Sequence, residues 1–405
     1  MAVILSLTTM AQEPEWLIEF KALNKQLNEQ INREEWKRSL ATMDKMRKLF
    51  FAQPDSVRIH HTGADDLSSS GFYYNLACFN VLDGNNKKGI KAFKDYTDRV
   101  IGKQEINLQQ ILTDSDLDPI RQEKEFEECI ARLRKWGDYK QILKDAKQYV
   151  RGNVPDGMRF HYANPNDPDL VRLRNHFNLD SIAGAGNEIS KIKNLLHWVH
   201  EVVPHDGSSK SPKEKNTIAM VELCKRENRG VNCRMMAQML TECYLAMGFK
   251  ARFVTCYPLN YVSDCHVITT VYSNTLNKWL WVDPTFDAYV MDEKDNMLSI
   301  AEVRERLRKD EFLKINDYAN WNHRSKQTKE EYLDRYMAKN LYYIQCNEWS
   351  RFNAETQGTG YSRRYITLMP YDKINEKMHD NTIGHYSTRV SDDRWFWQSP
   401  YGYDY

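Results

Sequence analysis

The sequence predicts a protein of the α+β class, in which a long helical region precedes a mixed core of helices and strands. The chain has 405 residues but only 17 Gly and 12 Pro, which favours long regular elements over an all-β protein with many tight turns. Apolar residues recur at helical spacing through most of residues 13–150. After residue 229, one further helical pattern gives way to segments rich in β-branched and aromatic residues, which are typical of strands.

Composition excludes several classes of protein. Fifty-seven Lys and Arg against 56 Asp and Glu leave a formal charge of +1, so no broad basic field indicates a nucleic acid partner. No run approaches the roughly 18 to 20 apolar residues of a membrane span, so we expect no integral membrane segment. The eight cysteines form no CxxC pair, which indicates neither a disulfide framework nor a structural zinc site.

Residues 1–11, MAVILSLTTMA, resemble the apolar end of a secretory signal peptide whose start is truncated, because small residues precede Gln12 but the positive n-region is missing. On this interpretation the protein is exported to the periplasm or the extracellular space. The alternative is a frayed terminus or a short buried helix, and then a cytoplasmic protein.

Residues 12–150 form the predicted helical domain. Asn32 and Glu35, three positions apart, predict the start of an amphipathic helix. The apolar face of this helix consists of Trp36, Leu40, Met43 and Phe50.

A helix, turn and helix of roughly 34 residues follow, with YYNLACFNVLDG at 73–84, a turn at Gly84 and an end near Gly102. This unit and the later DSDLDPIRQEKEF at 114–126 resemble the tetratricopeptide repeat. The resemblance implies a groove for a peptide or protein partner. A plain helical bundle packed on the rest of the chain is the alternative.

A boundary is predicted around Gly152–Asp169, where GNVPDG and NPNDPD cluster turn-forming residues. We expect the catalytic domain to span 155–345. It begins with helical patterning over Ile189–Val202. Residues 346–405, ending DDRWFWQSPYGYDY, are rich in aromatic residues and are expected to form an extension that packs on the body.

Cys233 stands where thiol chemistry is favoured. In RGVNCRMMAQMLTECYLAMG (229–248) apolar residues recur at helical spacing, Gly248 suits the C-terminal end, and Asn232 suits the N-cap. Cys233 then takes the first helical position, where unpaired N–H groups and the helix dipole stabilise a thiolate. The same N–H groups suit the oxyanion formed when the sulfur attacks a carbonyl.

A strand at Phe249–Cys256 is followed by a predicted hairpin. HVITTVYS (266–273) and KWLWVD (278–283) are separated by a four-residue turn at 274–277. Centring that turn sets Asp283 opposite Ile268, so Asp283 and His266 become diagonal neighbours on one face, within reach of a hydrogen bond. The sequence therefore predicts a triad of Cys233, His266 and Asp283.

These segments resemble the catalytic core of the transglutaminase-like family of papain-fold enzymes. The resemblance rests on GVNC with LAMGF, ARFVTC, DCHVITTVY and WLWVDPTF, and extends upstream to LLHWVHEVVPHDG. It implies a helix bearing the cysteine packed on an antiparallel sheet, and thiol chemistry on amides without a cofactor. Family members supply a second oxyanion donor from upstream of the nucleophile; His205, Asn216 and Trp198 are candidates, and none is assigned.

Some alternatives remain. Cys265 and His266 are adjacent on a strand and point to opposite faces, so a metal site with Cys233 is not expected. Trp279 and Trp281 lie on the same face of their strand as Asp283, because they are separated from it by even numbers of residues. Their side chains either line the active site or pack within the sheet.

The predicted function is a cysteine-dependent amide hydrolase or acyl transferase that acts on peptide, protein or cell-wall amides through a thioester. The alternative is a non-catalytic module that keeps a papain-like cleft in order to bind peptides.

Overall fold

The computed structural model describes residues 13–62, 66–67, 71–103, 105–260, 264–358, 363–375 and 387–402. The chain divides into two compact units, residues 1–138 and 139–405, each with its own core. The predicted signal segment at 1–11 lies outside the described residues. Where the structure describes the chain, no helix is long and apolar enough to cross a membrane.

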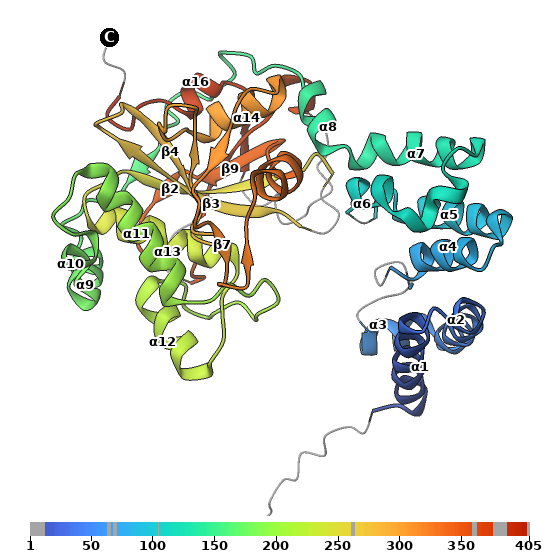
Figure 1. Ribbon diagram of the computed structural model, residues 1–405. Helices are drawn as coiled ribbons and strands as arrows, with labels where there is room; N and C mark the ends of the chain where they lie inside the picture. Colours follow the sequence, from blue (N-terminus) through green and yellow to red (C-terminus); the bar gives the residue numbers. More distant parts are fainter. Residues whose placement is uncertain are drawn as a thin grey trace, which may run out of the picture. The chain divides into compact units, whose positions relative to one another are not determined.

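The first unit is helical, as predicted (Figure 1). Its apolar core includes Met43, Phe50 and Phe93, which are almost fully buried. One expected start was wrong: Asn32 is the last residue of α1, and Glu35 is the N-cap of α2 without a side-chain cap hydrogen bond. The elements are α1 (Glu15–Asn32), α2 (Trp36–Phe51), α3 (Asp55–Thr62), α4 (Phe72–Leu82), α5 (Asn86–Val100), α6 (Leu108–Thr113), the 3-10 helix η2 (Ser115–Ile120) and α7 (Lys124–Gly137).

The helix, turn and helix predicted from residue 73 correspond to α4 and α5. Gly84 takes a φ of +80° in the turn, and Gly102 a φ of +72° after α5, conformations that glycine adopts without strain. Gly89 on α5 permits close packing, because a Cβ there would lie 2.4 Å from Val81 Cγ2 of α4. The two helices therefore form one tightly packed hairpin.

The boundary between the units lies earlier than expected. Helix α8 (Tyr139–Asp145) belongs to the second unit, where Leu143 is buried in a core shared with α14 (Ile300–Lys309). Arg308 of α14 donates hydrogen bonds to the carbonyls of Leu143 and Ala146. The turn-forming residues at 152–169 thus lie inside the second unit and not at its edge.

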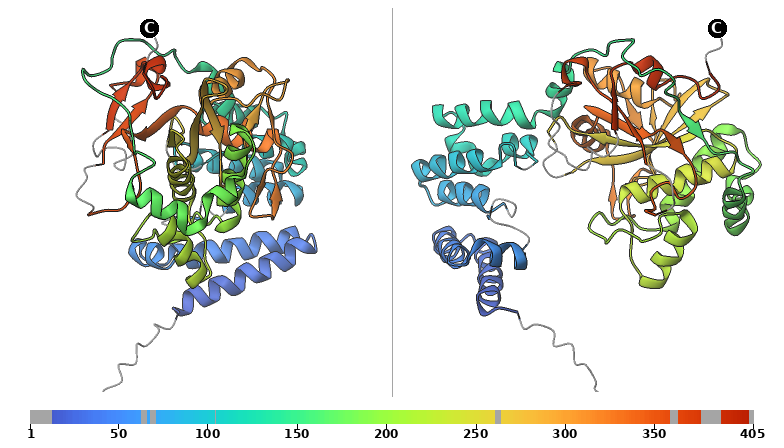
Figure 2. Two further views of the ribbon diagram at one scale, coloured as in Figure 1. Left: turned by 90° about the vertical axis from the view of Figure 1, so that its left-hand side faces the viewer. Right: turned by 180° about the vertical axis from the view of Figure 1, so that it is seen from behind.

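The second unit is built around a mixed sheet of six strands in the order β12-β11-β9-β2-β3-β4, antiparallel except for the parallel pair β11 and β12. Figures 1 and 2 show α11, α12 and α13 gathered on one side of this sheet. The sheet strands are β2 (Ala251–Tyr257), β3 (His266–Ser273), β4 (Lys278–Val282), β9 (Tyr343–Asn347), β11 (Tyr365–Leu368) and β12 (Ser387–Val390).

Two cores flank the sheet. Val271 and Leu280 join the core that contains α11 and α13, whereas Ile268 and Trp281 join the core that contains α14. The helices are α9 (Pro168–Phe177), α10 (Leu179–Ala183), α11 (Glu188–Val202), α12 (Thr217–Glu227), α13 (Cys233–Ala246), α14, the π-helix η3 (Glu330–Met337), α15 (Ala338–Asn340), the 3-10 helix η4 (Tyr371–Lys373) and α16 (Asp393–Phe396). Short strand pairs are formed by β1 (His161–Tyr162) with β10 (Trp349–Ser350), β5 (Val290–Met291) with β6 (Lys314–Ile315), and β7 (Asn320–Trp321) with β8 (Ser325–Lys326).

The hairpin of β3 and β4 has the predicted register. Ser273 pairs with Lys278 and Thr269 with Val282, so the turn is centred as expected and the next residue, Asp283, falls opposite Ile268. Helix α13 packs on β2 and β3, where Thr269 Oγ1 donates to the carbonyl of Ala237 at 3.0 Å. The predicted α+β architecture is confirmed.

The C-terminal residues belong to the second unit: β11 and β12 join its sheet, and the aromatic run that follows packs on the body as expected. The expected boundary at residue 345 falls within β9, and β11 and β12 complete the sheet. Arg252 of β2 lies between Trp279 of β4 and the C-terminal aromatic run: its guanidinium carbon is 4.3 Å from the ring centroid of Trp279 and 5.3 Å from that of Phe396. Arg252 is almost fully buried and donates to the carbonyl of Phe396 at 3.1 Å. These aromatic residues therefore stabilise a buried cation on the sheet.

Candidate active site

Cys233 occupies the first position of α13, as predicted. The side chain of Asn232 caps the helix by accepting a hydrogen bond from the Met235 N–H at 3.1 Å. The first N–H groups of a helix have no carbonyl partner within the helix, so the thiol meets the positive end of the helix dipole. Cys233 is half-buried and packs against Phe253 and Val267.

A close backbone approach brings His205 to the thiol. His205 forms a parallel bridge with Val231, two residues before Cys233, in which Asp206 N donates to Val231 O at 2.8 Å. Gly230 permits this approach, because a Cβ at that position would lie 2.4 Å from the carbonyl oxygen of Pro204. The glycine of the GVNC motif thus allows the segment that carries His205 to pack beside the start of α13.

His266 and Asp283 form the predicted pair. Nε2 of His266 lies 2.7 Å from Oδ2 of Asp283, and both residues are buried. Since Nε2 is engaged by the carboxylate, Nδ1 is the ring nitrogen that faces Cys233, with which His266 forms a side-chain hydrogen bond. The structure therefore brings all three predicted residues together.

Further residues hold the carboxylate in place. The Tyr332 hydroxyl donates to Oδ2 of Asp283 at 2.6 Å, and the Thr285 N–H donates to Oδ1 at 2.9 Å. The Trp281 indole N–H in turn donates to the Tyr332 oxygen at 3.0 Å. Trp281 is therefore packed behind the acid, where it orients the tyrosine that holds Asp283.

The π-helix η3 supplies one wall of the site. It carries Tyr332 and also Tyr336, whose ring centroid is 5.2 Å from that of His266. Phe286 lies on the His266 ring at 5.6 Å and comes from the loop that follows Asp283. Single π-helical turns are frequent at functional sites, because the wider turn changes which side chains share a face.

The electrostatics favour a thiolate and imidazolium pair. Burial opposes ionisation of Cys233, but hydrogen bonds from His205 and His266 and the positive charge of His266 lower the pKa of the thiol to about 6. Burial likewise disfavours the charged form of His266, but the Asp283 carboxylate outweighs it and raises the pKa of His266 to about 10. Both shifts favour a negative sulfur beside a positive imidazole, the ion pair that activates a thiol nucleophile.

Of the three candidates for a second oxyanion donor, only His205 lies beside Cys233. Its Nδ1 accepts the indole N–H of Trp321 at 3.0 Å. Indole can only donate, so Nδ1 is the lone-pair nitrogen and the ring hydrogen lies on Nε2, which is the nitrogen left to face the sulfur. Asn216 instead caps α12, and Trp198 packs on Phe177.

The hairpin of β7 and β8 fixes His205 from both sides of its backbone. Asn322, in the turn of this hairpin, accepts the His205 N–H at 2.8 Å and donates to the His205 carbonyl at 2.8 Å. The sequence did not predict a role for Trp321, Asn322, Tyr332 or Tyr336, because each lies far from Cys233 along the chain and belongs to a short or irregular element.

The remaining sequence candidates have structural positions. Trp279 does not wall the site; its ring packs on Arg252, and its indole N–H donates to the carbonyl of Gln398 at 3.0 Å. Cys265 is half-buried next to His266. The cysteines expected in the core are all buried there, namely Cys78, Cys129, Cys224, Cys243, Cys256 and Cys346.

Comparison with known proteins agrees with this geometry. Residues 175–284 match the family model of the transglutaminase-like superfamily, a stretch that includes Cys233, His266 and Asp283. The resemblance found in the sequence motifs is therefore confirmed for the core of the second unit. This superfamily consists largely of cysteine hydrolases and acyl transferases.

Comparison with solved structures gives a weak similarity. A solved structure of a candidate cysteine protease from Cytophaga hutchinsonii matches with 18% identity and a TM-score of 0.23. The match covers 35% of this chain and 47% of that chain, so it spans about half of the solved protein. Among curated proteins, none matches the chain at a significant level.

Proposed function

We propose that the protein is a cysteine-dependent amide hydrolase or acyl transferase, with Cys233 as nucleophile. The observation that carries the proposal is the arrangement at Cys233: the thiol begins α13 and forms hydrogen bonds with His205 and His266, and His266 pairs with the buried Asp283. A cysteine retained only for packing has no need of this environment, since burial alone raises the pKa of a thiol.

In the proposed reaction, the sulfur of Cys233 attacks the carbonyl carbon and forms a C–S bond, while the carbonyl electron pair moves to oxygen. The first N–H groups of α13 and Nε2–H of His205 donate to this oxyanion. When the C–N bond breaks, Nδ1 of His266 gives its proton to the leaving amine, and a thioester remains.

The thioester is then resolved by water or by an amine. His266 takes a proton from the incoming nucleophile as it attacks, and the C–S bond breaks to restore the thiolate and imidazolium pair. Asp283 keeps the ring oriented and stabilises its positive charge throughout. We favour water as the acceptor, which makes the protein a hydrolase of peptide, protein or cell-wall amides. The helical hairpin of α4 and α5 is proposed to hold a protein partner.

Selective alkylation tests the nucleophile. Iodoacetamide at pH 6.5, followed by peptide mapping, is expected to label Cys233 before the other seven cysteines. The matched control is Cys265→Ser, which removes the neighbouring half-buried thiol and should leave the labelling rate unchanged. First labelling of any cysteine other than Cys233 would contradict the assignment.

Turnover separates an enzyme from a binding module. With a library of peptide and cell-wall amides, the wild type should release amine and show an acyl adduct on Cys233 by mass spectrometry, and Cys233→Ser should do neither. Binding of the same compounds by both proteins, with no adduct and no amine released, would favour the non-catalytic alternative.

A further inference from the structure

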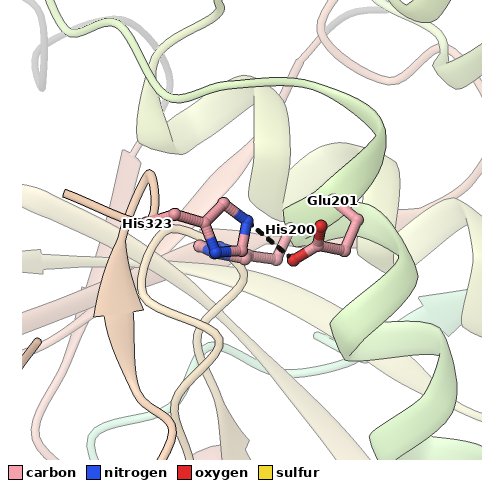
Figure 3. A group of neighbouring side chains, drawn as sticks. All are labelled: His200, Glu201 and His323. Atoms are coloured by element: carbon pink, nitrogen blue, oxygen red, sulfur yellow. Dashed lines mark ion pairs between the residues drawn. The ribbon is translucent and has the colours of Figure 1, made fainter.

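A second cluster of polar side chains lies where α11 meets the hairpin of β7 and β8. His200 and Glu201 come from the last turn of α11, and His323 comes from the turn of the hairpin (Figure 3). One potential ligand atom from each of these residues lies within 4.8 Å of the other two. His323 Nε2 is 2.9 Å from Glu201 Oε1. The proposed thiol reaction uses none of the three.

The hydrogen bonds of His200 leave one ring nitrogen without a suitable partner. Nδ1 lies 3.0 Å from the carbonyl oxygen of Pro284 and Nε2 lies 3.2 Å from Oδ1 of Asn320, so both ring nitrogens face acceptors. A neutral ring carries one hydrogen; when Nδ1 donates it to the carbonyl, Nε2 presents a lone pair to Oδ1.

The orientation of Asn320 shows that this neighbour is an oxygen. Oδ1 accepts a hydrogen bond from the backbone N–H of His323 at 2.7 Å, while Nδ2 donates to the carbonyl of Tyr318 at 3.1 Å. Two lone pairs that face each other require a positive charge between them. Either a second proton on the ring or a metal ion supplies this charge.

The geometry matches coordination by a metal ion. A tetrahedral zinc ion holds its ligands at about 2.0 to 2.1 Å, which separates two ligand atoms by about 3.3 Å. The observed separation between Nε2 of His200 and Oδ1 of Asn320 is 3.2 Å. A histidine ligand of zinc typically donates its other ring N–H to a backbone carbonyl, as His200 does to Pro284.

The surroundings add negative charge. Asp287 is almost fully buried, and its Oδ1 has no hydrogen-bond partner among the described residues. Its other oxygen, Oδ2, lies 2.7 Å from Nδ1 of His197, and the carboxyl interacts electrostatically with His200 and Glu201. A cation beside His200 would therefore lie close to two acidic side chains.

We propose that His200, Glu201, His323 and Asn320 bind a divalent transition-metal ion of the Zn²⁺ type, which clamps α11 to the hairpin of β7 and β8. Imidazole nitrogens with carboxylate and amide oxygens suit such an ion. The clamp lies next to functional elements, because Pro284 follows Asp283 and the hairpin carries Trp321, which orients His205. The inference does not depend on thiol catalysis.

Zn²⁺ binding by the full-length chain tests this site. Isothermal titration should show one equivalent bound by Cys233→Ser, a background that removes the thiol as a competing ligand. Adding His323→Ala or Glu201→Gln should weaken binding at least tenfold. His176→Ala, which removes an exposed histidine from α9, is the matched control and should change nothing. Both test variants replace exposed side chains, so the fold should be kept.

Two further readouts are independent of activity. Co²⁺ bound to Cys233→Ser should give visible d–d bands without thiolate charge-transfer bands, and Zn²⁺ should slow hydrogen exchange in residues 320–326. If Cys233→Ser binds no Zn²⁺, or binds it equally well after His323→Ala, the charge between His200 and Asn320 is a proton and the proposal is wrong.

Discussion

Replacing Gly230 by alanine tests whether His205 acts on the thiol. A Cβ at position 230 would lie 2.4 Å from the carbonyl oxygen of Pro204 and 2.9 Å from Cβ of Asp206, whereas ordinary contact begins at 3.4 Å. The neighbour at 2.4 Å is backbone, so the segment that carries His205 must retreat by about 1 Å.

The expected loss follows from this displacement. A misplacement of about 1 Å at a catalytic group costs on the order of a hundredfold in rate. The pKa of Cys233 should also rise above its value of about 6, because His205 is among the groups that lower it. Gly230→Ala should therefore lower the rate of amide turnover. In the pH profile of Cys233 alkylation, the rise in rate on the acid side should move to higher pH.

The assay is the rate of Cys233 alkylation as a function of pH, measured together with amide turnover. Gly207→Ala is the matched control, because its Cβ would meet His205 only at an ordinary 3.7 Å. Trp321→Phe provides a second variant without crowding: it removes the N–H that fixes the His205 tautomer, and should lower turnover about tenfold. If Gly230→Ala and Trp321→Phe both keep the alkylation profile and the amide turnover of the wild type, the role of His205 is refuted.

Four other predictions concern His266, the Asp283 carboxylate that pairs with it, and the boundary between the two units. The rate of acylation should be bell-shaped in pH: it is lost as pH falls through about 6, where Cys233 gains a proton, and as pH rises through about 10, where His266 loses one. Asp283→Asn should keep the fold, lower turnover and move the alkaline limb downward, because the carboxylate raises the pKa of His266; an unmoved limb would remove Asp283 from the mechanism. Tyr332→Phe removes a hydrogen bond to this carboxylate that is worth about 1.5 to 3 kcal/mol. The rate of amide turnover, measured in a stopped assay, should therefore fall by up to about a hundredfold. A fragment of residues 139–405 should be soluble and alkylated like the full chain, whereas one starting at 156 should aggregate, because it lacks the buried Leu143 of α8.

The features predicted correctly depend on local chemistry. The N-cap, the first helical position of Cys233 and the helix end at Gly248 follow from residues within one short segment. The register of β3 and β4 follows from a four-residue turn, and this register alone is enough to place His266 beside Asp283. In each case sequence neighbours determine the geometry.

The features that were missed depend on contacts between distant segments. Leu143 looks like the end of the first helical region, but it packs on a helix more than 150 residues later. The four-residue strands β11 and β12 are too short to show an alternating pattern, so their part in the sheet was not predicted. His205 was one of three equal candidates, because the bridge to Val231 and the indole of Trp321 are tertiary contacts.

The two histidines beside Cys233 differ in what their second ring nitrogen meets. His266 faces a buried carboxylate, which stabilises a proton on the ring and suits it to hold and return the proton of the reaction. His205 faces an indole N–H, which cannot accept a hydrogen bond, so a proton on that nitrogen would meet another N–H. The two rings therefore cannot exchange roles: His266 transfers protons, and His205 keeps one fixed N–H to donate to the oxyanion. If the carboxylate stood beside His205 and the indole N–H stood beside His266, the two histidines would exchange these roles.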